Sequence, residues 1–119
     1  MSGIQREEGE VLKEGTKHDI GKPRFDLVPP EALEEIVKVL TFGASKYAAR
    51  NWEKGIQYGR VYGALQRHLS AFWKGEDKDP ETDLPHLAHA GCCLFFLLTY
   101  HQRGMKEWDD RPVPARGEE

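Results

Sequence analysis

The chain has 119 residues, a formal net charge of −3, five histidines and two cysteines. This length is typical of one domain with a modest core, and the charge excludes a general nucleic-acid-binding surface, which would be strongly basic. The N-terminal stretch lacks the apolar core of a signal peptide, and the longest apolar run, 90–98, is far shorter than the roughly 20 residues that span a bilayer. We therefore expect a soluble, cytoplasmic protein without nucleic-acid or membrane partners.

One folded domain is predicted over residues 17–108. Residues 1–16 carry Glu, Lys and Gly with little periodicity and are expected to form a flexible arm. Residues 109–119 combine Pro, Gly and charge without an apolar pattern and are expected to form a flexible tail. Gly and Pro also punctuate 15–30, which predicts a loop ahead of the first helix.

Three helices are predicted in the folded part. The first begins at the proline pair 29–30 and ends near Asn51, since proline suits a first helical turn. The second covers about 58–74, and the third runs from Asp83, as its N-cap, to about 103. The first helix carries an apolar stripe at i, i+3, i+4, i+7 spacing, made of Leu33, Ile36, Val37, Leu40, Ala44 and Tyr47.

The fold class predicted from these elements is all-α, an antiparallel bundle of three main helices completed by oligomerisation. No segment shows the alternating apolar and polar pattern of a strand. The third helix is apolar nearly all round from Ala90 to Leu98, so it needs more cover than two partner helices supply. A second copy of the chain is the simplest cover, which predicts a homodimer or a higher homo-oligomer.

A group of histidines and acids is the first candidate site. His86 and His89 share one side of the third helix. His68 lies on the apolar stripe of the second helix, and antiparallel packing brings all three to one level, below Glu76 and Asp79 on the connecting turn. Bundle metal sites are built from such residues on facing helices, and a divalent ion there would polarise a phosphoryl oxygen or activate water. The alternative is that the histidines are satisfied core residues and the acids serve the turn.

A cationic loop is the second candidate site. Lys17, Lys22 and Arg24 surround a glycine, which suits an anion such as phosphate, because a guanidinium can bind two oxygens at once. The glycine and lysine spacing of a P-loop is absent. Alternatively, the loop is solvated and its cations pair with Asp19 and Asp26.

A third group combines a cation, two aromatic rings and an amide within two turns: Lys46, Tyr47, Asn51 and Trp52. Trp52 would stack on a nucleotide base and Asn51 would contact its edge. The alternative is that Tyr47 and Trp52 only close the end of the core, as aromatic residues at helical spacing usually do.

Much of the chain, from Lys17 to Tyr100, resembles a known family. The segments that carry the resemblance are KHDIGKPRFDLVPPEALEEIVKVLTFGASKYAARNWEKG and RHLSAFWKGEDKDPETDLPHLAHAGCCLFFLL. They resemble the phage-type dATP/dGTP diphosphohydrolases, which are related to the MazG-like and MazZ-like all-α nucleoside-triphosphate pyrophosphohydrolases. The resemblance implies a helical, oligomeric enzyme that converts a purine deoxynucleoside triphosphate to the monophosphate and pyrophosphate with Mg²⁺ or Mn²⁺, and so adjusts the nucleotide pool during phage replication.

The metal ligands depart from the MazG-like pattern, in which Glu-Glu-x-x-Glu and Glu-x-x-Asp hold the ion. If Glu-x-x-Asp is aligned with His86 and His89, Glu-Glu-x-x-Glu falls near His68. Histidines then stand where the family has carboxylates. Imidazole suits Mn²⁺ or Zn²⁺ better than Mg²⁺. Either Glu76 and Asp79 bind a hard ion, or the ion differs, or the register is another one.

The leading hypothesis is therefore metal-dependent hydrolysis, with Glu76, Asp79 and His86 as catalytic residues. The metal would be held by His68, Glu76, Asp79, His86 and His89. The substrate would be bound by Lys17, Asp19, Lys22, Arg24, Lys46, Asn51 and Trp52. The alternatives are a non-catalytic nucleotide-binding protein, such as a sponge or regulator, and a structural helical dimer with core histidines.

Overall fold

The computed structural model describes residues 12–112, and the fold is all-α as predicted. The elements in chain order are η1 (Phe25–Leu27), α1 (Pro30–Lys46), η2 (Asn51–Lys54), α2 (Tyr58–Trp73), α3 (His86–Gln102) and η3 (Lys106–Trp108), where η marks a short 3₁₀ helix. Within 12–112 the only extended pairing is an isolated bridge between Lys78 and Pro85. Most of the predicted arm and tail lies outside the described residues.

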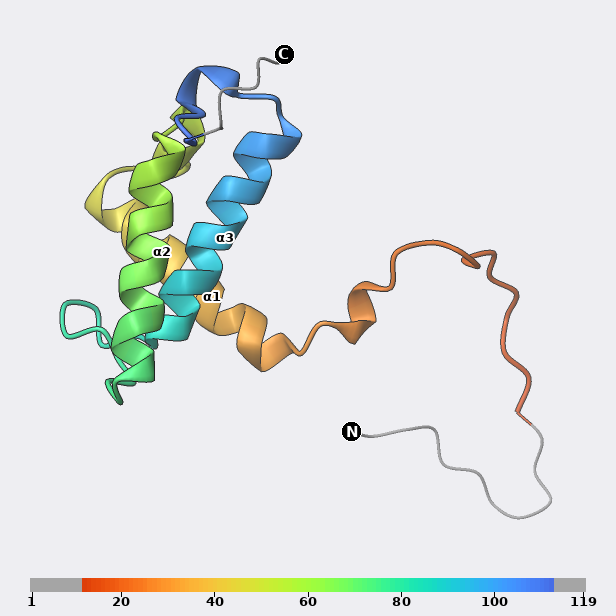
Figure 1. Ribbon diagram of the computed structural model, residues 1–119. Coiled ribbons are helices and arrows are strands. Elements are labelled where there is room, and N and C mark those ends of the chain that lie inside the picture. The colour runs from red at the N-terminus through yellow and green to blue at the C-terminus, as the bar shows by residue number, and fades with distance from the viewer. Residues whose placement is uncertain (1–11, 113–119) are drawn as a thin grey trace.

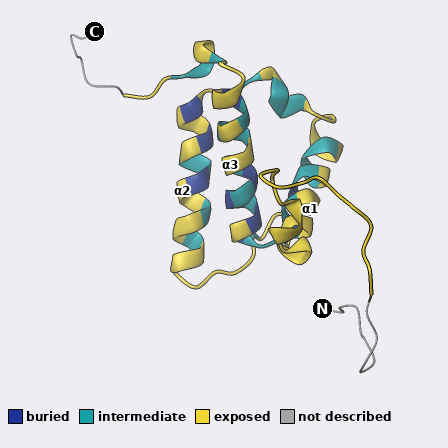
Figure 2. Cartoon of the chain, turned by 90° about the vertical axis from the view of Figure 1, so that its right-hand side faces the viewer, coloured by how far each residue is buried: buried dark blue, intermediate teal, exposed yellow. Residues whose placement is uncertain are grey.

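Helix α3 occupies the middle of the fold. It runs antiparallel to α2, while α1 crosses its other side (Figure 1). Figure 2 shows the buried residues concentrated on α2 and α3. Gly91 allows the close approach of α1, because a Cβ at this position would lie 2.7 Å from the Cδ1 atom of Ile36. The chain turns from α2 into α3 through residues 74–85, and this turn carries the acids of the candidate metal site.

Two apolar clusters form the core. Val39, Ala88 and Cys92 join α1 to α3. Tyr58, Val61 and Tyr100 join α2 to α3, with Trp52 packed against them. The hydroxyl of Tyr100 donates a hydrogen bond of 2.6 Å to the carbonyl oxygen of Trp52, and burial raises the pKa of this hydroxyl to about 12, so it remains a donor.

Two predicted helix boundaries are wrong. The first helix ends at Lys46, with Tyr47 as its C-cap. It could not have extended to Asn51, because Arg50 adopts a left-handed conformation with φ of 62° that no helix can include. Asp83 is not the N-cap of the third helix; it too is left-handed, with φ of 59°. Pro85 takes the N-cap position instead, since the residue before a proline is disfavoured in a helix.

The apolar stripe predicted for the first helix is only partly buried. Val39, which the stripe left out, is its buried residue, while Ile36 and Leu40 pack beside it. Leu33, Val37 and Tyr47 remain exposed. Helix α3 likewise leaves large apolar side chains uncovered, namely Leu87, Leu94, Phe95 and Leu98. Within the part of the chain that the structure describes, no helix has the length and apolar content needed to cross a membrane.

The substitution Tyr100→Phe tests the second core cluster. It removes the only hydroxyl that bonds the Trp52 carbonyl in the described structure. We expect the free energy of unfolding to fall by about 0.5–1.5 kcal/mol, because one hydrogen bond is lost while the Trp52 carbonyl still accepts from the amide of Gly55. Urea denaturation measures the change. Tyr62→Phe is the matched control, since Tyr62 is 56% exposed; equal effects of the two substitutions would contradict the assignment.

Candidate metal centre

The turn between α2 and α3 is held in shape by its own backbone. Gly75, with φ of 102°, ends the second helix. The amide of Asp79 donates to the carbonyl of Leu84 at 2.9 Å, and the amide of His86 donates to the carbonyl of Asp77 at 2.9 Å. These bonds fix Asp79 beside the first residue of α3.

Three side chains converge at this point: His68 of α2, Asp79 of the turn and His86 of α3. The Nδ1 atom of His68 lies 2.9 Å from the Nδ1 atom of His86 and 3.9 Å from the Oδ2 atom of Asp79. One potential ligand atom from each of the three lies within 4.8 Å of the others. The predicted convergence of His68 and His86 across the antiparallel pair is therefore present in the structure.

Glu76 sets the orientation of the His86 ring. Its Oε1 atom lies 2.7 Å from the Nε2 atom of His86. Because a carboxylate only accepts hydrogen bonds, the Nε2–H group of His86 donates to Glu76, and the neutral ring then has its lone pair on Nδ1. That lone pair points to the shared space with His68, as in the carboxylate–histidine–metal arrangements of proteins.

His89 contacts a residue of the centre, His68, without being one of its three converging side chains. Its ring stacks on His68 with a centroid distance of 4.6 Å and an interplanar angle of 13°. Its Nε2 atom lies 2.7 Å from the hydroxyl oxygen of Thr82. Sequence reasoning missed Thr82, because a threonine in an acidic turn carries no signal for a histidine contact.

The protonation states of the centre suit metal ligation. Desolvation lowers the pKa of His68 and of His89, and their charged neighbours add to or oppose this effect. Desolvation alone would raise the pKa of Asp79, but the amides of Glu81 and Thr82 donate to its Oδ1 atom and the net pKa is lowered. Neutral imidazole and ionised carboxylate are the forms that bind a cation.

The donor set fits a divalent transition metal. His68 and His86 offer imidazole nitrogens and Asp79 offers an oxygen. Imidazole suits Zn²⁺ and other transition ions, whereas an all-oxygen set suits Mg²⁺. Glu76 and His89, also predicted as ligands, contact these residues, and their direct ligation stays a prediction.

The other predicted site residues lie elsewhere on the chain. Lys17, Asp19, Lys22 and Arg24 are exposed on the N-terminal segment, which extends away from the helices (Figure 1). Arg24 pairs with Asp26 at 2.7 Å. The structure therefore does not bring these four residues to the histidines of the same chain.

Lys46 alone among the predicted phosphate ligands reaches the turn. Its Nζ atom lies 2.8 Å from the Oε2 atom of Glu81, and Glu81 donates its amide to Asp79. Trp52 stacks on Phe96 with a centroid distance of 4.4 Å and an interplanar angle of 9°, while Asn51 is half-buried beside it. One face of the Trp52 ring is thus occupied by the core, and a base contact by Trp52 or Asn51 stays a prediction.

Asp79→Asn tests the metal centre. The amide oxygen of asparagine can still accept from Glu81 and Thr82, which preserves the turn, but the ionised ligand is lost. We expect the affinity for Mn²⁺ or Zn²⁺ to fall by about tenfold or more, since even indirect partners of a metal change affinity by about 10–100-fold. Isothermal titration calorimetry measures it.

Asp77→Asn is the matched control, because it removes the same charge from the same turn at an exposed side chain. Its metal affinity should stay within about twofold of the original protein. If both substitutions weaken metal binding equally, the turn acts through its net charge and Asp79 is not a ligand.

Comparisons with known proteins agree with the resemblance seen in the sequence. Residues 12–111 match the family described as dATP/dGTP diphosphohydrolase, N-terminal. The chain is 40% identical over 84 residues to a protein of Salmonella phage PMBT28 named dATP/dGTP diphosphohydrolase. That alignment covers 71% of this chain and 29% of the relative, so the chain spans less than a third of the relative's length.

No solved structure matches the chain. The family match, in contrast, extends over nearly all of the residues that the structure describes, including all three helices and the turn that holds the candidate centre. The chain therefore belongs to the dATP/dGTP diphosphohydrolase, N-terminal, family.

Proposed function

We propose that this chain hydrolyses a purine deoxynucleoside triphosphate, dATP or dGTP, to the monophosphate and pyrophosphate, with a divalent metal. The observation that carries the proposal is the convergence of His68, Asp79 and His86 in a member of this family. The relative's name specifies the substrate class for that protein. In an infected cell the reaction would adjust the nucleotide pool in the cytoplasm of the host.

The reaction consumes one water molecule. The water oxygen forms a bond to the α-phosphorus while the bond from that phosphorus to the bridging oxygen breaks, and pyrophosphate leaves. Mn²⁺, Zn²⁺ or Mg²⁺ held by His68, Asp79 and His86 would polarise phosphoryl oxygens and lower the pKa of water. Glu76, beside His86 and 55% exposed at its side chain, is the carboxylate placed to accept the proton of the water.

The remaining residues of the centre keep the ligands in place. Glu76 holds the tautomer of His86, and the backbone amides of the turn hold the Oδ1 atom of Asp79. His89 limits the rotation of the His68 ring by stacking on it. Such orientation matters because small displacements of catalytic groups slow a reaction strongly.

We also propose that the active form is a homo-oligomer, supported by uncovered apolar residues in two places. Leu94 and Leu98 of α3 are 54% and 56% exposed. Ile20 and Phe25, on the N-terminal segment, are 100% and 83% exposed. A second copy would cover both regions, and it would give Lys17, Lys22 and Arg24 a route to the centre of a neighbouring chain.

An assay with the four deoxynucleoside triphosphates tests the enzymatic proposal. We expect dATP or dGTP to give equal amounts of monophosphate and pyrophosphate with added Mn²⁺, Mg²⁺ or Zn²⁺, and no product after chelation of the metal. Product analysis by ion-exchange chromatography measures both products. Glu76→Gln should lower kcat by about 100-fold or more, because a proton acceptor is lost, with Asp77→Asn as the control.

Two outcomes would contradict this proposal. Release of inorganic phosphate instead of pyrophosphate would place the cleavage at another bond. Tight nucleotide binding without turnover under any metal would instead support the non-catalytic nucleotide-binding alternative.

Sedimentation velocity tests the oligomer. We expect the original protein to sediment as a dimer or larger species, and Leu94→Glu combined with Leu98→Glu to shift it toward the monomer, because carboxylates would enter an apolar interface. Gln66→Glu, at an exposed position of α2, is the control. A monomeric original protein at micromolar concentration would overturn this part of the proposal.

A further inference from the structure

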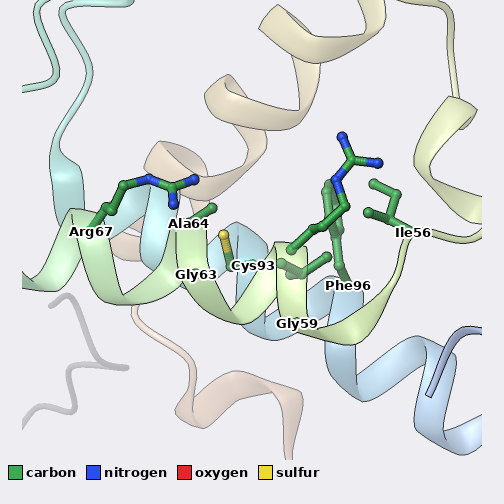
Figure 3. A pocket seen from close by; sticks show the side chains of 9 residues that line it. Ile56, Gly59, Gly63, Ala64, Arg67, Cys93 and Phe96 are labelled. Carbon is green, nitrogen blue, oxygen red and sulfur yellow. The ribbon is translucent and has the colours of Figure 1, made fainter. Parts of the chain in front are cut away.

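A groove follows the second helix where it meets α3. It has a volume of about 460 Å³. Its floor is made of small residues of α2, including Gly59, Gly63 and Ala64, and of Cys93 from α3, with Ile56 and Phe96 at one end (Figure 3). The groove therefore has an apolar end and a narrow floor that lets a ligand approach the backbone.

Three cations line this side of α2 at a constant spacing. Arg60, Arg67 and Lys74 are seven residues apart, so they lie on one stripe of the helix at intervals of about 10 Å. All three are exposed. Among the described residues, none of them forms an ion pair with a carboxylate. The sequence analysis did not identify these three residues as a binding site, although their seven-residue spacing is visible in the sequence.

The exposed side chain of Arg67 lies along the groove. A Cβ at Gly63, one turn earlier, would lie 3.3 Å from its Nη1 atom, and Figure 3 shows the guanidinium above this part of the helix. Gly63 thus makes room for the Arg67 side chain. Desolvation lowers the pKa of His68 and raises the pKa of Cys93; the nearby charge of Arg67 adds to the first effect and opposes the second.

A second hollow lies between Arg67 and Glu76. It has a volume of about 450 Å³ and is lined by Arg67, Ser70, Ala71, Lys74 and Glu76. Arg67 borders both hollows. Glu76 accepts the hydrogen bond of His86, so Arg67 borders the groove on one side and the hollow beside a contact of the centre on the other.

We propose that this groove is the binding site of the nucleoside triphosphate. The nucleoside occupies the apolar end beside Ile56, Phe96 and Arg60. Arg67 binds the α-phosphate next to His68, and Lys74 binds the pyrophosphate part. The inference rests on the proposed function for the choice of ligand, and on the cationic stripe and the two hollows that share Arg67 for the site.

This assignment differs from the one that the sequence suggested. Lys17, Lys22 and Arg24 are not near the groove of their own chain, and Lys46 is paired with Glu81. The cations of α2 have no such competing partner among the described residues. Guanidinium groups bind phosphate through two parallel hydrogen bonds, which makes Arg67 the strongest of the three anchors.

Binding of a non-hydrolysable nucleotide without metal tests the site. The probe is dATP with an imido group between the α- and β-phosphorus, titrated calorimetrically in the presence of a chelator. Arg67→Gln should weaken binding by about 10–100-fold, as expected for a charge-assisted hydrogen bond. Arg67→Lys should weaken binding less, because lysine keeps the positive charge but cannot form two parallel hydrogen bonds to one phosphate. Lys74→Gln should weaken binding by about 3–10-fold.

Lys38→Gln is the matched control. Lys38 is an exposed lysine of α1 that pairs with Glu35, so its substitution changes the net charge equally at a distant place. Its binding constant should stay within twofold of the original protein. Inorganic tripolyphosphate should displace the probe from the original protein and far less effectively from Arg67→Gln.

The outcomes separate this inference from the enzymatic proposal. If the original protein hydrolyses dATP while Arg67→Gln and Lys74→Gln bind the probe as Lys38→Gln does, the groove assignment is wrong and the activity stands. If no hydrolysis occurs but Arg67→Gln loses binding, the site stands and the activity is wrong. Circular dichroism of each variant identifies a folding defect, and Lys74→Gln, at the exposed end of α2, then decides the question.

Discussion

The buried ring of His86 is the constraint on which the candidate centre depends. The residue is 4% exposed, so each polar atom of its ring needs a partner. One ring nitrogen contacts His68 of the facing helix, and the other contacts Glu76 of the turn. The backbone amide donates a hydrogen bond to the carbonyl oxygen of Asp77. A single side chain thereby joins α2, the turn and the start of α3. Any movement of one of these parts would leave a buried nitrogen without a partner, at a cost of about 1–3 kcal/mol.

A second constraint, the backbone of the turn, explains the position of Asp79. A turn that follows α2 and precedes α3 must satisfy its own backbone, and Asp79 does so by accepting from the amides of Glu81 and Thr82 with one oxygen. Its other oxygen faces His68. One carboxylate therefore serves structure and the candidate centre together. This is why Asp79→Asn, which changes mainly the second of these roles, separates them.

Much of the fold was predictable because it depends on local chemistry. The second helix was predicted within one residue, since Gly75 can adopt the positive φ that ends it. The convergence of His68 and His86 followed from antiparallel packing and helical spacing alone. The left-handed conformations of Arg50 and Asp83 were not predictable, because residues with a Cβ rarely adopt them without tertiary support.

The largest difference between the predicted site and the structure is the position of the cationic loop, residues 17–24. The composition of residues 17–24 suits phosphate, but composition contains no information about distance, and the loop extends away from the helices. The seven-residue spacing of Arg60, Arg67 and Lys74 does contain such information, because this spacing places the three side chains on one side of a helix. The pattern was less visible because its members are separated by mostly apolar residues.

The proximity of the stripe to the centre has an electrostatic consequence. Desolvation lowers the pKa of His68, and the charge of Arg67 adds to this effect, which favours the neutral form that binds metal. A phosphate group bound at Arg67 would reverse this effect by bringing negative charge to His68, and it would then favour protonation of the ring. A metal cation at His68 and His86 would be attracted by the same phosphate and would exclude the proton. In the proposed arrangement nucleotide and metal therefore strengthen each other's binding, while a proton on His68 competes with the metal.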